Sequence, residues 1–237
     1  MLEPVIRVRA QPGRARAMER GLSLVELLVG VAIALFIAAT GATLLAGNLR
    51  ENRSLLLEAR LMQDLRSAAD VITRDLRRAG YWAGATDGIS VNGAAPAGVN
   101  PYLALAPDRA ASDAVSFRYS RSATESGAVG TSEQFGYRLR AGTIEMQLGA
   151  GNWQALTDAG TLRVTEFSVT PTVQDISLQG FCAGACPRGS STCPPHQQVR
   201  SLALSITAHL ASDAGVTRSI RSDVRLRNDP VIGACAS

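Results

Sequence analysis

The sequence predicts an α+β fold in which one long N-terminal helix packs on an antiparallel β-sheet. Three observations predict it: an apolar run close to the N-terminus, an amphipathic helical pattern that continues the run without a proline, and a later series of segments that alternate apolar and polar residues. We expect four parts in chain order: a basic leader (1–21), the apolar half of the helix (22–46), its amphipathic half (47–80) and a β-rich globular domain (81–237).

The leader, residues 1–21, is basic. It holds five of the chain's 24 arginines and two of its 20 acidic residues, so nineteen arginines and eighteen acids remain in the rest of the chain. A chain that has lost this leader is nearly neutral, and the total charge of +4 therefore does not indicate nucleic-acid binding. Arginines ahead of an apolar segment favour a cytoplasmic N-terminus. Met1 and Met18 both remain open as the start of translation.

Residues 22–46 predict a membrane-spanning helix. They are 25 apolar or small residues with a single charge, that of Glu26. A helix needs about 20 such residues to cross a bilayer, whereas the apolar core of a secretory signal has only about 7–15. We therefore expect an anchor in the inner membrane that places the rest of the chain, beyond about residue 47, on the periplasmic side.

The amphipathic half of the helix, residues 47–80, has one apolar face. Its apolar residues recur at spacings of three and four, which puts them on the side that contacts a domain. They are Leu57, Leu61, Leu65, Ala68, Ile72, Leu76 and Ala79. Gly80 is the predicted end of the helix, because glycine readily adopts the backbone conformation that terminates one.

The remainder of the chain predicts strands joined by turns. Residues 83–114 are rich in glycine, alanine and proline and predict an irregular connection. After it, alternation predicts six strands: Val115–Tyr119, Phe135–Arg140, Thr143–Leu148, Leu162–Thr170, Val199–Leu210 and Thr217–Arg227. Ala141-Gly142 predicts a hairpin turn, and residues 212–215 predict a second hairpin loop.

Glu26 is the residue with the most specific chemistry. A carboxylate within an apolar helix is costly, although the cost falls near the helix N-terminus, where the helix dipole favours an acid. A cut between Gly21 and Leu22 would create a new α-amino group close to this carboxylate. That amine can pair with Glu26 of a neighbouring subunit inside a bundle of apolar helices. A misplaced subunit would leave a buried charge unpaired, so the pair would set the register of assembly.

The stretch from Arg20 to Val29 resembles the cleavage signal of type IV pilins and of type II secretion pseudopilins. Both have a basic leader, a glycine, an apolar first mature residue and a glutamate four residues later; Leu22 stands where the family usually has phenylalanine. The resemblance implies a pilin-like fold and a prepilin peptidase that cuts after Gly21 and methylates Leu22. It also implies that Glu26 is the assembly glutamate.

A second resemblance narrows the family. Residues 72–82, Ile-Thr-Arg-Asp-Leu-Arg-Arg-Ala-Gly-Tyr-Trp, are similar to the end of the first helix in minor pilins of the PilW type, which are related to the J-type pseudopilin. This implies a minor pilin that helps to start assembly at or near the pilus tip, moving from the inner membrane to the cell surface. Its partners would be other minor and major pilins and the pilus assembly platform. The alternative is a J-like minor pseudopilin of a type II secretion system.

Four cysteines, Cys182, Cys186, Cys193 and Cys235, lie in the last quarter of the chain. An even number in an exported domain predicts disulfides, and four cysteines allow three pairings. We expect Cys235 to join the loop of residues 182–193. Zinc binding by three of these cysteines with His196 is the alternative, but their spacing is not a common zinc pattern. We therefore predict no metal and no cofactor.

Two rival classes of protein remain, enzymes and binding modules. The only histidines are His196 and His209, neither lies in a catalytic motif, and we predict no catalytic residues. A membrane-anchored adhesin or DNA-binding module would use arginines on the strands, although acids interspersed among them favour an ordinary solvated sheet surface. These arginines are Arg118, Arg121, Arg138, Arg140, Arg218, Arg221, Arg225 and Arg227.

Overall fold

The computed structural model describes residues 21, 23–88, 98–122 and 127–236. They form one long helix, α1 (Leu24–Leu76), followed by antiparallel strands, which confirms the α+β fold. The chain divides into two compact units, residues 1–53 and 54–237, and α1 runs from the first into the second. The predicted leader and the start sites Met1 and Met18 lie outside the described residues.

The second unit contains two antiparallel sheets where the sequence predicted one. The first sheet is a meander whose strands follow one another in chain order. Its strands are β1 (Leu105–Ala106), β2 (Ala114–Arg118), β3 (Gln134–Arg140), β4 (Thr143–Leu148) and β5 (Trp153–Ala155). The second sheet has the order β6-β7-β8, with β9 paired to the beginning of β7. Its strands are β6 (Leu162–Ser177), β7 (His196–Leu210), β8 (Asp213–Arg225) and β9 (Val231–Ile232).

Short 3-10 helices join several of these elements. They are η1 (Ala85–Gly88), η2 (Thr131–Glu133) and η3 (Gln179–Phe181). The structure thus has η1 and β1 inside the connection that was predicted to be irregular. The sequence also missed β5 and β9, because two or three residues are too few to show an alternating pattern.

Two turns test the hairpin predictions. The turn at Ala141-Gly142 is confirmed: both residues have positive φ, 51° and 80°, and the flanking Arg140 and Thr143 pair across the strands. The second predicted hairpin is present, but its loop is residues 211–212 and not 212–215. Leu210 already pairs with Asp213, and the next pair is His209 with Thr217, so β8 begins earlier and accommodates the extra residues as a bulge.

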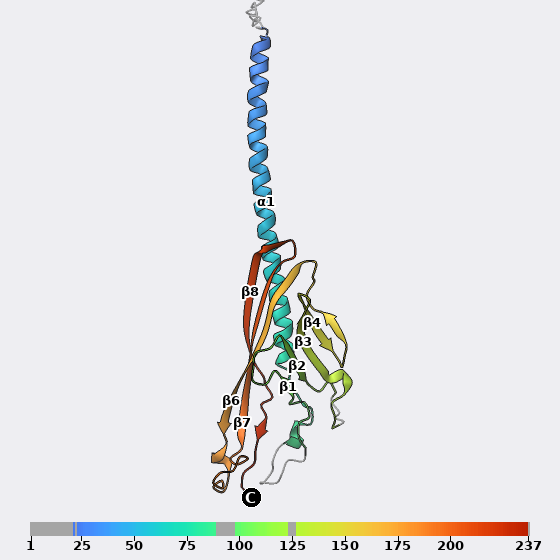
Figure 1. Ribbon diagram of the computed structural model, residues 1–237, viewed down its shortest axis with the longest axis vertical. Helices are drawn as coiled ribbons and strands as arrows, with labels where there is room; N and C mark the ends of the chain where they lie inside the picture. Colours follow the sequence, from blue (N-terminus) through green and yellow to red (C-terminus); the bar gives the residue numbers. More distant parts are fainter. Residues whose placement is uncertain (1–20, 22, 89–97, 123–126, 237) are drawn as a thin grey trace, which may run out of the picture. The chain divides into compact units, whose positions relative to one another are not determined.

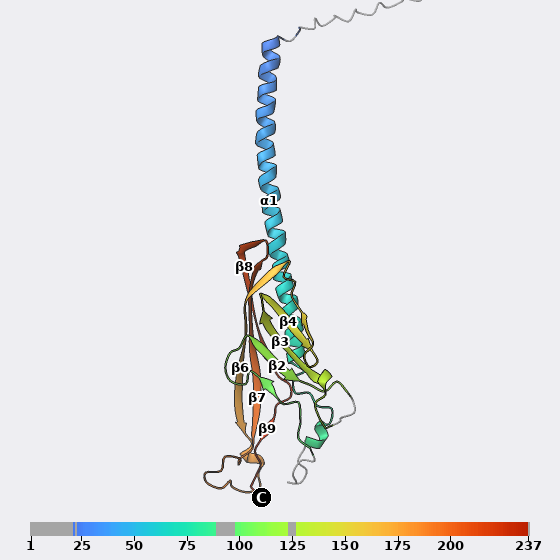
Figure 2. The ribbon, with the colours of Figure 1, turned by 45° about the vertical axis from the view of Figure 1, so that its right-hand side comes forward.

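The core of the second unit joins the helix to both sheets (Figures 1 and 2). Buried residues of α1 pack with residues from the inner faces of both sheets; the fully buried members include Leu65, Ile72, Phe117, Tyr137, Leu204 and Ile206. The Tyr137 hydroxyl donates a hydrogen bond to Oδ2 of Asp75 at 2.7 Å, which ties the end of α1 to β3. Burial and the nearby Asp75 carboxylate raise the pKa of Tyr137, so the hydroxyl keeps the proton that it donates.

The helix ends at Leu76, four residues before the stop predicted at Gly80. Residues 77–80 form turns, in which Ala79 stays buried and continues the apolar face. Gly80 has φ +74°, the conformation expected of a terminating glycine, but its N–H donates to the Arg118 carbonyl of β2 at 2.8 Å. A contact with the sheet therefore replaces the last turn of helix.

Candidate functional site

The predicted cleavage segment lies directly ahead of α1. Gly21 is exposed and outside the helix, Ser23 is also non-helical, and Leu22 lies outside the described residues. A Cβ atom added to Gly21 would meet nothing within 4 Å. The fold itself therefore does not require a glycine at this position, and a requirement for one would come from a protein that recognises the segment.

Glu26 lies in the first turn of α1 and is exposed. The Leu27 N–H donates to the Ser23 carbonyl at 3.1 Å, so the helical hydrogen bonds begin at Ser23. The unpaired N–H groups of this first turn create a partial positive charge that stabilises a carboxylate. Ser23 and Glu26 also have the spacing of a capping box, a local role that is compatible with pairing to another subunit later.

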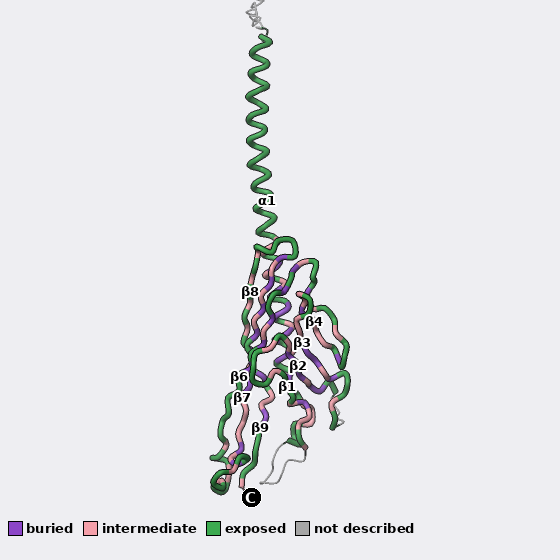
Figure 3. The backbone as a smooth tube through the Cα atoms, in the orientation of Figure 1, coloured by how far each residue is buried: buried purple, intermediate pink, exposed green. Residues whose placement is uncertain are grey.

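The apolar half of α1 has no cover within the described part of the chain. Every described side chain from Leu24 to Arg53 is exposed, as Figure 3 shows, including Phe36 at 74%. The hydroxyls of Thr40 and Thr43 donate to the carbonyls of Phe36 and Thr40, so these polar groups are satisfied within the helix itself. The helix is long and apolar enough to cross a membrane. An apolar surface of this size needs lipid or other helices against it.

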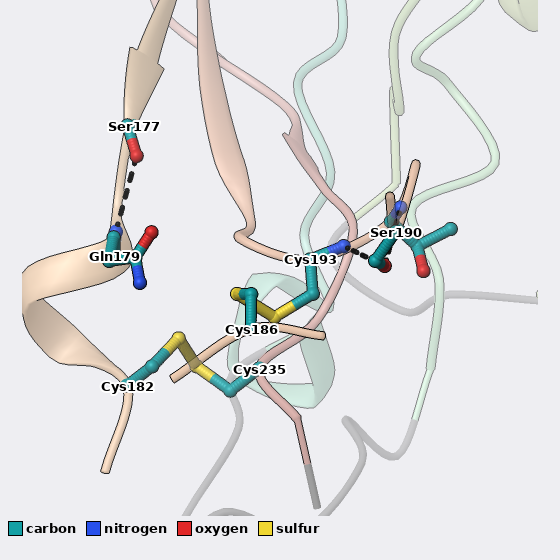
Figure 4. The surroundings of a disulfide bond; sticks show 8 residues. Ser177, Gln179, Cys182, Cys186, Ser190, Cys193 and Cys235 are labelled. Carbon is teal, nitrogen blue, oxygen red and sulfur yellow. Dashed lines mark hydrogen bonds between the residues drawn. A yellow bond between two sulfur atoms is a disulfide. The ribbon is translucent and has the colours of Figure 1, made fainter. Parts of the chain in front are cut away.

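The four cysteines form two disulfides in the loop between β6 and β7 and at the C-terminus (Figure 4). Cys182 is bonded to Cys235, and Cys186 to Cys193, which selects one of the three pairings that the sequence left open. The Cys193 N–H donates to the Ser190 hydroxyl at 3.0 Å and the Gln179 N–H to the Ser177 hydroxyl at 3.4 Å. All four sulfur atoms are bonded to one another in pairs, so none is a free thiolate for zinc.

One protein family matches this chain. The family is described as "Prepilin peptidase-dependent protein B", and the match extends over residues 54–226. The chain belongs to the prepilin peptidase-dependent protein B family. No curated protein and no solved structure matches the chain.

Membership of the prepilin peptidase-dependent protein B family implies a pilin-like protein or one associated with type II secretion, with prepilin peptidase as a partner. The match begins at Ser54, where the second compact unit also begins. It therefore does not include Gly21 or Glu26. The family match and the cleavage motif are separate observations on different parts of the chain, and both point to the same peptidase.

In this family member the strand arginines do not form one basic stripe. Arg138 of β3 pairs with Glu145 at 2.7 Å and lies over the ring of Trp153, and Arg218 of β8 pairs with Glu58 of α1. Arg138 and Arg140 belong to one sheet, whereas Arg218, Arg221 and Arg225 belong to the other. The structure therefore divides and partly neutralises the surface that a DNA-binding module would need.

Two buried charges, which the sequence analysis did not single out, connect distant parts of the fold. Arg200 lies on the inner face of β7 at 9% exposure and donates to the carbonyls of Leu103 (2.9 Å) and Asn228 (3.1 Å). Burial lowers the pKa of Arg200, and the nearby Asp229 carboxylate opposes this effect. A signal was present, because Arg200 is in phase with the core residues Leu202 and Leu204.

The second buried charge is Glu133, which joins three loops. Its carboxylate accepts hydrogen bonds from the Gly130 N–H (2.7 Å), the Arg121 N–H (3.2 Å) and the Tyr102 hydroxyl (2.9 Å). Burial alone would raise the pKa of Glu133, but the hydrogen bonds and the Arg121 charge outweigh it and lower the pKa. No local pattern around Glu133 indicated this role.

Neutralising Glu133 is expected to destabilise the second unit. Glu133→Gln replaces one acceptor oxygen with an NH2 group that faces donors, so we expect unfolding to cost about 1–3 kcal/mol less at pH 7. Because the pKa of Glu133 is lowered in the folded state, its carboxylate stabilises the fold fully at a pH above the ordinary glutamate pKa of 4.5. This stabilisation is lost as the pH falls through the folded-state pKa of Glu133. The difference between variant and native chain should therefore shrink in acid.

Urea unfolding of the full chain in detergent, followed by tryptophan fluorescence at pH 7 and again in acid, measures both effects. Glu166→Gln is the matched control, since Glu166 is exposed on β6. Equal stability of the Glu133→Gln and native chains at pH 7 would show that the three hydrogen bonds contribute nothing.

Proposed function

We propose that this chain is a structural minor pilin of a type IV pilus, without enzymatic activity, that helps to initiate assembly at or near the tip. The main support for the proposal is the arrangement of residues at the start of α1. A helix with uncovered apolar side chains begins at Leu24, three positions after the exposed Gly21, and its only acid in the apolar run is Glu26 in the first turn. The similarity of residues 72–82 to PilW-type pilins supports the minor-pilin assignment.

The proposed mechanism depends on the charges near the N-terminus and on the transfer of the apolar helix from lipid to a bundle of pilin helices. The basic leader keeps the N-terminus in the cytoplasm while residues 22–46 span the inner membrane. Prepilin peptidase cuts after Gly21 and methylates Leu22, which creates a positive amine at the start of the helix. As the subunit leaves the lipid, its apolar surface packs on neighbouring pilin helices. Glu26 then offsets a neighbour's amine, because neither charge is stable alone in an apolar bundle.

Cleavage after Gly21 is the testable core of this proposal. In cells with prepilin peptidase, we expect a chain that begins at methylated Leu22, and in cells without it the whole precursor. Gly21→Val should block cleavage, because a branched side chain at the cut site hinders the peptidase. Intact-mass measurement of the purified chain distinguishes these forms.

Gly30→Ala is the matched control for Gly21→Val. Gly30 is also a glycine with no atom within 4 Å of an added Cβ, but it lies inside α1. The Gly30→Ala chain should be cleaved normally. A working native protein that retains residues 1–21 would exclude the pilin assignment.

The second candidate function is a J-like pseudopilin of a type II secretion system. It is favoured by the same residues 72–82, since the two kinds of subunit are related at this point. The distinguishing measurement is the effect of deleting the gene. Loss of surface pili with normal protein secretion supports the pilus, whereas loss of secretion with normal pili supports the secretion system. Neighbouring genes for minor pilins or for a secretin give an independent indication.

A further inference from the structure

Three arginines surround one hollow at the end of α1 in the second unit. Arg77 follows the helix, Arg225 ends β8 and Arg227 comes two residues later. The hollow has a volume of about 420 Å³ and is lined by these arginines and Leu226. The two segments are almost 150 positions apart in the chain, so no sequence pattern indicated that they lie side by side.

Hydrogen bonds fix the backbone of the two segments that carry the arginines. The Asn228 side-chain amide donates to the Ala79 carbonyl at 3.0 Å, and the Leu226 N–H donates to the Arg200 carbonyl at 3.0 Å. Leu226 is fully buried, whereas the arginines on either side of it are exposed. The backbone on both sides of the hollow is therefore fixed by the core, and the guanidinium groups face solvent.

Two of the carboxylates near the hollow in sequence, Asp229 and Asp75, already accept hydrogen bonds, whereas Asp223 is exposed on β8. Oδ2 of Asp229 accepts from Arg225 (2.9 Å) and from Gln197 (3.1 Å), and Oδ2 of Asp75 accepts from the Tyr137 hydroxyl. Within the part of the chain that the structure describes, no carboxylate forms an ion pair with Arg77 or Arg227. The hollow thus concentrates positive charge in a chain that is nearly neutral without its leader.

We propose that this arginine hollow binds the carboxylates of an acidic protein surface on a neighbouring subunit of the assembly. This inference rests on the proposed function. A guanidinium presents a planar set of donors that matches a carboxylate, and arginine is enriched at the centres of protein interfaces. Unpaired charges on both partners also accelerate and orient their encounter before contact.

The arrangement favours an acidic protein over duplex DNA. A duplex offers phosphates along an extended track, and binding it requires a basic surface of matching length. The strand arginines near the hollow do not extend it into such a track, since Asp223 lies between Arg221 and Arg225 on the same face of β8 and Arg218 is paired with Glu58. A compact hollow with two unpaired arginines is suited to one or two carboxylates.

The test uses the full chain in detergent and a fluorescent hexaglutamate peptide as the acidic probe. The double variant Arg77→Gln with Arg227→Gln should bind hexaglutamate about tenfold more weakly than the native chain, because each lost contact is a charged hydrogen bond. The leader arginines are present in every variant and contribute the same background. The matched control is Arg163→Gln with Arg188→Gln, which removes two exposed arginines elsewhere and should change binding little.

Three outcomes would overturn the proposal. The first is that the native chain and the hollow variant bind hexaglutamate with equal affinity. The second is that the control variant loses as much hexaglutamate affinity as the hollow variant. The third is that a short DNA duplex binds more tightly than hexaglutamate through the same two arginines. Unchanged urea unfolding of each variant ensures that a loss of binding is not a loss of fold. Cleavage after Gly21 is measured separately, so a failure of the hollow to bind is distinguishable from a failure of the pilin assignment.

Discussion

Glu26→Ala is expected to leave cleavage after Gly21 intact and to prevent the chain from entering filaments. In the proposed function, the peptidase would act at Gly21, which is exposed ahead of α1 and five positions from the substituted residue. In the assembled bundle, however, the new amine of a neighbour would lose its carboxylate. Leaving one member of a buried ion pair alone costs about 3–5 kcal/mol, enough to exclude the subunit from a growing assembly.

Two measurements on the same cells check this result: the intact mass of the chain and its amount in the sheared fibre fraction. Glu51→Ala is the matched control, since Glu51 is an exposed glutamate of the same helix beyond the apolar run. The Glu51→Ala chain should be both cleaved and assembled. Normal quantities of Glu26→Ala in fibres would show that the carboxylate has no part in assembly.

Leu65→Ala is expected to cause the largest loss of stability in the second unit. Leu65 is fully buried where α1 contacts the core. Removal of its side chain leaves a cavity between rigid elements, and such changes cost about 2–5 kcal/mol. Leu56 lies nine residues earlier in the same helix and is 72% exposed, so Leu56→Ala should change the free energy of unfolding by less than about 0.5 kcal/mol.

Urea unfolding monitored by tryptophan fluorescence reports on the second unit, because Trp82 and Trp153 both lie in it. The same pair of variants also separates folding from assembly. If Leu56 contacts neighbouring helices in a filament, Leu56→Ala will reduce incorporation without changing stability. Equal destabilisation by both variants would contradict the packing described for Leu65.

The fold was predictable wherever a residue pattern is local and long. The spacing of Leu61, Leu65 and Ile72 predicted the buried face of α1, and the alternation in β7 predicted its inner face. The helix end was misplaced because the Gly80 N–H bonds to Arg118 of β2, a partner far away in the chain. The division into two sheets was also missed, since it depends on which strands pair and not on their individual patterns.

The same contrast applies to the residues for which a function is proposed. Gly21 and Glu26 form a motif within a few positions, which a sequence displays directly. The bond between Cys182 and Cys235 and the hollow formed by Arg77 and Arg227 depend on contacts between distant segments, and no local pattern indicates them. Arg200 is intermediate: its place among the core residues of β7 was predictable, but its acceptors at Leu103 and Asn228 were not.

The bond between Cys182 and Cys235 has a mechanical consequence. These cysteines are 53 positions apart, and the bond closes a covalent ring that contains β7, β8 and β9. Tension applied between the helix and the C-terminus passes across the sulfur atoms and bypasses everything inside the ring. Each residue pulled straight would otherwise lengthen the chain by about 3.3–3.6 Å. The load therefore does not straighten β7, β8 or β9, and these strands cannot add to the length of the link between the two ends.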